Sequence, residues 1–105
     1  MSIVKVDYGE SGNPSVSKIY DESGIFSSGS WVDTGIKPTA SFTFIYAYND
    51  TAAVTFGSWI YDKENDSLSQ VYDSTRASCR IGSNGTIEVQ STQTTYPILH
   101  VQIYG

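Results

Sequence analysis

The chain of 105 residues is long enough for one domain with a modest hydrophobic core. Its net charge of −5 comes from 11 acidic and 6 basic residues, and the basic residues form no cluster. We therefore expect neither nucleic acid nor an anionic membrane as a partner, because both require a basic surface. Cys79 is the single cysteine, which excludes an internal disulfide and a thiolate metal cluster.

The first 15 residues are predicted to form an arm separate from the main domain. Ile3–Tyr8 alternates apolar and polar residues like a short strand, and a polar linker rich in Gly, Ser and Pro follows it. Such a strand packs on its own sheet or pairs with another protomer, and the sequence leaves both arrangements open. The arm shows no apolar run of the length that a signal peptide has, so we expect synthesis in a cytosol.

From residue 16 onward, β-prone runs alternate with turn-forming runs, which predicts one sandwich domain over residues 16–105. The expected strands are Val16–Tyr20, Gly24–Ser28, Trp31–Thr34, Ala40–Tyr48, Ala53–Asp62, Ser67–Tyr72, Arg76–Ile81, Thr86–Gln90 and Ile98–Tyr104. Asn84-Gly85 is a strong hairpin signal, and no window shows a helical period. The predicted fold is an all-β, jelly-roll-like antiparallel β-sandwich of about eight short strands without significant helix.

Period-two alternation assigns side chains to the two faces of each strand. In Ala40–Tyr48 the aromatic side chains share one face, opposite Thr43, Ile45 and Ala47. In Ala53–Asp62 the alternation places Val54, Phe56 and Ile60 opposite Thr55, Trp59 and Tyr61. The later strands are expected to point Ala77, Cys79, Ile81, Ile87, Val89, Leu99, Val101 and Ile103 toward one side. Aromatic residues on both faces exceed the need of one core face, so a second layer or a partner must cover them.

The sequence carries no recognisable catalytic device, and we expect neither an enzyme nor a cofactor. The only histidine, His100, lies mid-strand on a mixed face, which is typical of a structural or surface histidine. Cys79 lies on the apolar side of its strand, as a buried structural thiol does. A Gly-x-Ser-x-Gly elbow and a phosphate-binding glycine loop are both absent from the sequence.

Asp62, Glu64 and Asp66 are weak candidates for a cation site. Their spacing resembles the start of a calcium loop. Ser67 stands where that loop needs Gly, however, and Asp73 replaces its bidentate Glu. We therefore predict a solvated hairpin tip and no bound metal.

Aromatic residues are the remaining candidates for ligand or interface contacts. The candidates are Trp31, Trp59, Tyr61, Tyr46 and Tyr48. Each could stack on a sugar ring, fill a protein interface or pack in the core. A sugar-binding platform would use Trp31, Trp59 and Tyr61.

Six short motifs carry a resemblance to a known family. They are Ile25–Gly29, Val32–Pro38, Phe42–Tyr46, Tyr61-Asp62, Gly85–Val89 and Tyr96–Tyr104. Through them, residues 24–105 resemble the small β-sandwich domains of tail, baseplate and tail-fibre proteins of bacteriophages and prophages. Ile36 stands where this family usually has Phe.

The resemblance implies a structural or receptor-binding module that is made in the bacterial host cytoplasm and acts in the virion. It implies self-assembly to a trimer or hexamer, other phage tail proteins as partners, and contact with host cell-wall saccharide. It carries over no catalytic residue. Two alternatives from the sequence are a stand-alone carbohydrate-binding module and a small acidic inhibitor of a host enzyme.

Overall fold

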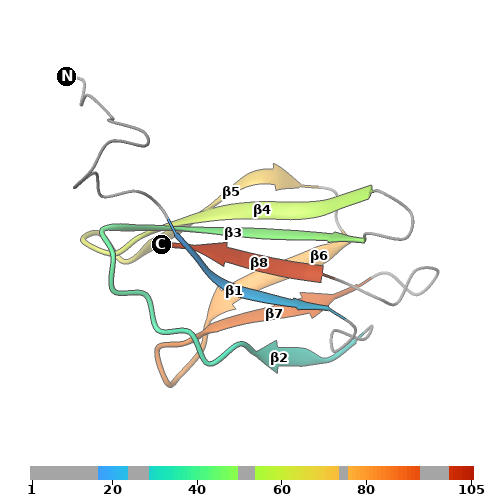
Figure 1. Ribbon diagram of the computed structural model, residues 1–105. Helices are drawn as coiled ribbons and strands as arrows, with labels where there is room; N and C mark the ends of the chain where they lie inside the picture. Colours follow the sequence, from blue (N-terminus) through green and yellow to red (C-terminus); the bar gives the residue numbers. More distant parts are fainter. Residues whose placement is uncertain (1–16, 24–28, 50–53, 74–75, 93–99) are drawn as a thin grey trace.

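The structure is an all-β sandwich. The computed structural model describes residues 17–23, 29–49, 54–73, 76–92 and 100–105, in which there is no helix and hence none that could cross a membrane (Figure 1). The strands are β1 (Lys18–Ser23), β2 (Trp31–Asp33), β3 (Phe42–Asn49), β4 (Val54–Asp62), β5 (Ser67–Asp73), β6 (Ala77–Ile81), β7 (Ile87–Ser91) and β8 (His100–Tyr104). The predicted all-β fold is confirmed, whereas the predicted arm and the strand Gly24–Ser28 lie outside the described residues.

The strands form two antiparallel sheets of unequal size. The larger sheet has five strands in the order β1-β8-β3-β4-β5, and the smaller has three in the order β2-β7-β6 (Figure 1). Every pair of neighbouring strands runs antiparallel. The central strand β3 therefore lies between β8 and β4. Its outward-pointing side chains lie in the middle of the outer face of the larger sheet.

The hydrophobic core fills the space between the two sheets. Its buried members are Ile45, Ala47, Phe56, Trp59, Tyr61, Ala77, Ile87, Val89, Val101 and Ile103. Strand β3 turns its small and aliphatic side, Thr43, Ile45 and Ala47, toward this core. The aromatic side of β3 therefore faces away from the smaller sheet.

Strict alternation fails in β4 because the strand contains a bulge. Ala47 pairs with Gly57 but the next residue, Tyr48, pairs with Thr55, so Phe56 is an extra residue in β4. Phe56 and Trp59 consequently both reach the core although they are three residues apart. The prediction that Phe56 shares a face with Ile60, opposite Trp59, was wrong for this reason.

Alternation correctly predicts the inner faces of the last three strands. Ala77, Ile87, Val89, Val101 and Ile103 are buried, and Cys79 and Ile81 pack against them. Leu99, predicted for the same side, lies outside the described residues.

The segment Asp33–Ile36 is shaped by a hydrogen bond within the turn and is held along β7 by hydrogen bonds to Ile87. The Gly35 amide donates to Asp33 Oδ1 at 2.8 Å, and Gly35 has the positive φ of 76° that glycine tolerates best. The Thr34 hydroxyl donates to the Ile87 carbonyl oxygen at 2.8 Å, and the Ile87 amide donates to the Ile36 carbonyl oxygen at 2.9 Å. This anchored turn carries the chain from the smaller sheet toward β3.

Candidate functional site

The outer face of the larger sheet carries an aromatic row along β3. Phe42, Phe44, Tyr46 and Tyr48 alternate with the core residues of this strand. The strand register places His100, Gln102 and Tyr104 of β8 beside Tyr48, Tyr46 and Phe44, respectively. One face of the molecule thus combines aromatic, apolar and polar side chains from its central strands.

One end of this face is a polar–aromatic strip, formed by Tyr46, Tyr48, His100 and Gln102. The ring centroids of Tyr46 and Tyr48 lie 4.9 Å apart, and those of Tyr48 and His100 lie 4.7 Å apart. All four side chains are half-buried, so stacking leaves part of each ring in contact with solvent. The strip therefore offers both ring surface and polar groups to a partner.

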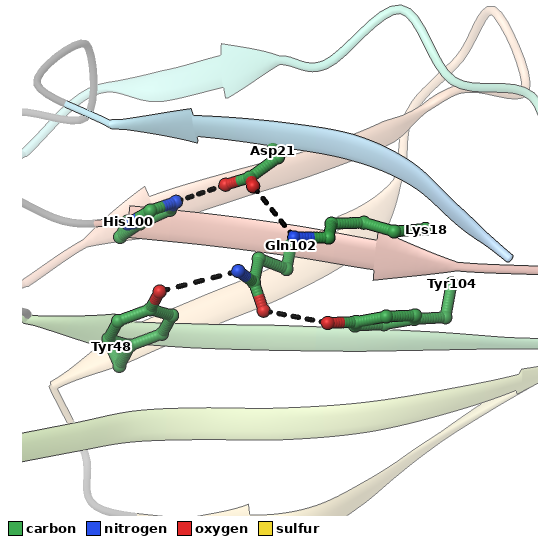
Figure 2. A network of polar contacts seen from close by, with 6 residues as sticks. All are labelled: Lys18, Asp21, Tyr48, His100, Gln102 and Tyr104. Carbon is green, nitrogen blue, oxygen red and sulfur yellow. Dashed lines mark hydrogen bonds and ion pairs between the residues drawn. The ribbon is translucent and has the colours of Figure 1, made fainter.

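Hydrogen bonds fix the side chains in and around this strip, as Figure 2 shows. The Tyr104 hydroxyl donates to Gln102 Oε1 at 2.9 Å, and Gln102 Nε2 donates to the Tyr48 hydroxyl at 3.4 Å. The hydroxyl groups of Tyr46 and Thr55 lie 3.2 Å apart and share a hydrogen bond. The Gln102 amide is consequently held in one orientation between two tyrosines.

Asp21 links the edge strand β1 to this strip. Its carboxylate contacts His100 Nε2 and accepts a hydrogen bond from Lys18 Nζ at 3.0 Å (Figure 2). The hydrogen bonds from His100 and then from Lys18 lower the pKa of Asp21 to about 2. Asp21 therefore stays ionised at neutral pH beside the strip.

The other end of the same face is an apolar hollow. It has a volume of about 290 Å³ and is lined by Phe42, Thr43, Phe44, Ile60 and Tyr104. Phe42 is 62% exposed and Phe44 is 42% exposed. This end of the face presents carbon surface to solvent, with no ionisable side chain except the Tyr104 phenol lining it.

The five aromatic candidates from the sequence lie in three different places. Tyr46 and Tyr48 belong to the polar–aromatic strip. Trp59 and Tyr61 are buried in the core, and the Tyr61 hydroxyl donates to Asp66 Oδ1 at 2.6 Å. Trp31 lies on the outer face of the smaller sheet, so the structure does not bring Trp31, Trp59 and Tyr61 together as a sugar-binding platform.

Trp31 makes a cation–π contact on the outer face of the smaller sheet. The guanidinium carbon of Arg80 lies 4.0 Å from the centroid of the Trp31 ring. Arg80 Nε also donates to Glu88 Oε1 at 2.6 Å, which completes a small surface cluster. The ring of Trp31 is therefore covered in part by a residue of its own chain.

In the β4–β5 turn, Asp62 and Asp66 accept hydrogen bonds from nearby residues, and Glu64 is exposed. Asn65 Nδ2 donates to Asp62 Oδ2 at 2.7 Å, and Asp66 accepts the hydrogen bond from Tyr61. Asp66 also adopts the positive φ of 49° that closes the turn. Among the described residues no three His, Cys, Asp or Glu side chains are grouped so that they could hold a metal ion.

Cys79, expected as a structural thiol, and His100, expected as a structural or surface histidine, lie in different sheets. Cys79 packs against the core from the inner side of the smaller sheet, and burial raises the pKa of its thiol to about 12. His100 lies on the outer face of the larger sheet. The two groups thus cannot act as a nucleophile and its base.

The site offers contact surfaces, namely a polar–aromatic strip and an apolar hollow on adjacent parts of one sheet. Sequence alternation indicated the row of aromatics along β3, but it could not show that Asp21 meets His100, 79 residues further along the chain. The hollow was also missed, because alternation did not decide whether the Ile60 side or the Trp59 side of β4 points away from the core. Neither a family model, nor a curated protein, nor a solved structure matches this chain.

Proposed function

We propose that this chain is a non-catalytic accessory protein of a bacteriophage or prophage virion, associated with the tail, baseplate or fibre. It assembles as a trimer or hexamer with other tail proteins and contacts the host surface. The observation that carries this proposal is the polar–aromatic strip on the outer face of β3 and β8. The motif resemblance over residues 24–105 supplies the virion context.

The strip has the composition of a contact surface. An antiparallel sheet in a sandwich needs only one apolar face, which here is the face toward the core. Tyrosine, which joins an apolar ring to a polar hydroxyl group, is enriched where proteins bind partners. Gln102 and the ionised Asp21 add hydrogen-bonding groups that are already oriented, which lowers the entropic cost of binding.

The proposal is tested on virions of the phage or induced prophage that encodes the chain. We expect the protein to be detected in purified particles and to have the mass of a trimer or hexamer by light scattering. Tyr48→Ala should reduce incorporation into particles at least several-fold, because it removes the ring that stacks on both Tyr46 and His100. Ser69→Ala, on the exposed edge strand β5, is the matched control and should assemble normally.

A monomer that is absent from purified particles would contradict the proposal.

The strip itself favours one second candidate, a stand-alone carbohydrate-binding module. Ring surface beside a fixed amide is suited to a sugar, which presents both C–H faces and hydroxyl groups. In that case host wall polysaccharide should raise the melting temperature of the wild type and leave that of Tyr48→Ala unchanged.

A further inference from the structure

The apolar hollow is large enough to hold side chains that the described residues do not supply. A cavity of about 150 Å³ lined by apolar side chains accommodates a benzene ring. The hollow measures about 290 Å³ and opens to solvent between Phe44, Ile60 and Tyr104. It can therefore take aromatic or branched aliphatic side chains from another segment.

The described chain begins beside this hollow. The Gly105 amide donates to the Ser17 carbonyl oxygen at 3.0 Å, and Lys18 pairs with Tyr104. Tyr104, the partner of Lys18, is one of the residues that line the hollow, so the described chain begins one strand away from it. The 16 preceding residues thus enter the described fold at this end of the larger sheet.

The sequence of this N-terminal segment fits an apolar surface. Val4, Val6 and Tyr8 alternate with Lys5 and Asp7, so an extended backbone would direct the three apolar side chains to one face. A linker of eight residues, 9–16, separates them from Ser17 and spans at most about 29 Å. From β1 to β4 there are three strand spacings, about 15 Å in all, so the segment can reach every residue that lines the hollow.

We propose that residues 4–8 of the same chain dock on the outer face of the larger sheet, with Val4, Val6 and Tyr8 covering the apolar hollow. A short linker keeps the segment at a millimolar effective concentration, which favours its own hollow over that of a second copy. Docking there leaves the polar–aromatic strip open. The inference therefore goes beyond the proposed virion function and does not depend on it.

Nuclear Overhauser effects on the isotope-labelled full chain test this docking directly. We expect cross-peaks between the methyl groups of Val4 or Val6 and the ring protons of Phe44 or Tyr104. A mixture of labelled and unlabelled protein, observed with isotope filtering, separates contacts within a chain from contacts between chains. Cross-peaks within the chain support the proposal, whereas their absence, or cross-peaks only between chains, would overturn it.

Two neighbouring substitutions provide a matched pair for a second readout. Val6→Ser should abolish these cross-peaks and increase the binding of a hydrophobic fluorescent dye several-fold, because Phe42 and Phe44 become accessible. Lys5→Ser, on the opposite face of the segment, should change neither signal. Neither residue belongs to the described core, so circular dichroism should show both variants folded. Equal behaviour of the two variants would contradict the docking geometry and leave the virion assay unaffected.

Discussion

The two tryptophans lie in opposite environments, although the sequence made both of them candidates for core, ligand or interface contacts. Trp59 is 3% exposed within the core, while Trp31 lies on the outer face of the smaller sheet against Arg80. Trp59→Ala should lower the free energy of unfolding by about 3–5 kcal/mol, since it removes a large buried side chain and leaves a cavity. Trp31→Ala should cost about 1 kcal/mol or less, the range of an exposed cation–π contact.

Urea unfolding of the two variants beside the wild type measures this difference. Arg80→Ala is the control for the cation–π contact and should resemble Trp31→Ala, because Arg80 is half exposed and its ion pair with Glu88 therefore contributes little. Equal losses for Trp31→Ala and Trp59→Ala would mean that Trp31 is also a core residue.

Asp21 should make the stability of the fold sensitive to acid. Its pKa is lowered to about 2 in the folded protein by His100 and Lys18, while an unfolded Asp titrates near its ordinary value of 3.8. A depressed folded pKa stabilises the fold above the unfolded pKa, and this contribution is lost as the pH falls from about 4 to 2. Melting temperatures of the wild type should therefore drop across this window.

Asp21→Asn should flatten this part of the pH profile, because the amide does not titrate. The measurement is a series of thermal melts between pH 5 and 2 at low salt, where surface ion pairs are least screened. Asp62→Asn is the control, since it changes the same residue type in the β4–β5 turn. If the acid slope of Asp21→Asn equals that of the wild type, Asp21 does not couple β1 to β8 in solution.

How far the sequence predicts the site depends on how far each residue obeys simple alternation. Tyr46 and Tyr48 were predictable as neighbours on one face because β3 alternates without interruption from Phe42 to Asn49. Trp59 and Tyr61 could not be assigned to the core, because both faces of β4 carry aromatic or aliphatic residues. The pairing of Asp21 with His100 depends on β1 lying next to β8, which nothing in the local sequence encodes.

At the scale of the strand, the bulge in β4 and a long-range contact of β1 account for two differences from the sequence prediction. Phe56 in β4 and Ile19 in β1 are each an extra residue on one side of a ladder. Strand β1 was expected at Val16–Tyr20 with a turn from Asp21, but it continues to Ser23 because Asp21 bonds to His100 and Lys18. Composition favours a turn there, and a long-range contact outweighs it.

The edge strand β5 is the least protected edge of the larger sheet. Its seven residues carry one charge, Asp73 at the end, whereas the opposite edge β1 carries Lys18, Asp21 and Glu22. Val71 is the extra residue of a bulge in β5 and is 57% exposed. Val71→Lys should therefore slow aggregation several-fold, because a charge on an open edge discourages pairing with another chain.

Ile19→Lys is a matched control, since Ile19 is the extra residue of the bulge in β1 and is 43% exposed. We expect it to change the aggregation rate much less, because β1 is already charged. Light scattering during incubation below the melting temperature gives both rates, and urea unfolding should show stabilities within about 0.5 kcal/mol of the wild type. If Ile19→Lys lowers the aggregation rate more than Val71→Lys does, β1 is the vulnerable edge.

At the scale of the molecule, the number and direction of the strands were predictable but their division between sheets was not. Hairpin signals such as Asn84-Gly85 join neighbours in sequence, here β6 and β7. The pairs β1–β8, β3–β8 and β2–β7 join strands that are distant in the chain. They depend on which inner faces pack together, so the arrangement of five and three strands emerges only in three dimensions.

The shared core should make the two sheets unfold as one unit. Trp59 in the larger sheet and Ile87 and Val89 in the smaller one belong to the same buried cluster, so neither sheet keeps a core without the other. The single-tryptophan variants Trp31→Phe and Trp59→Phe place a fluorescent probe in the larger and in the smaller sheet, respectively. Within each variant, the urea midpoint from fluorescence should equal that from far-ultraviolet circular dichroism. An earlier fluorescence midpoint in Trp59→Phe alone would show instead that the three-stranded sheet opens before the five-stranded one.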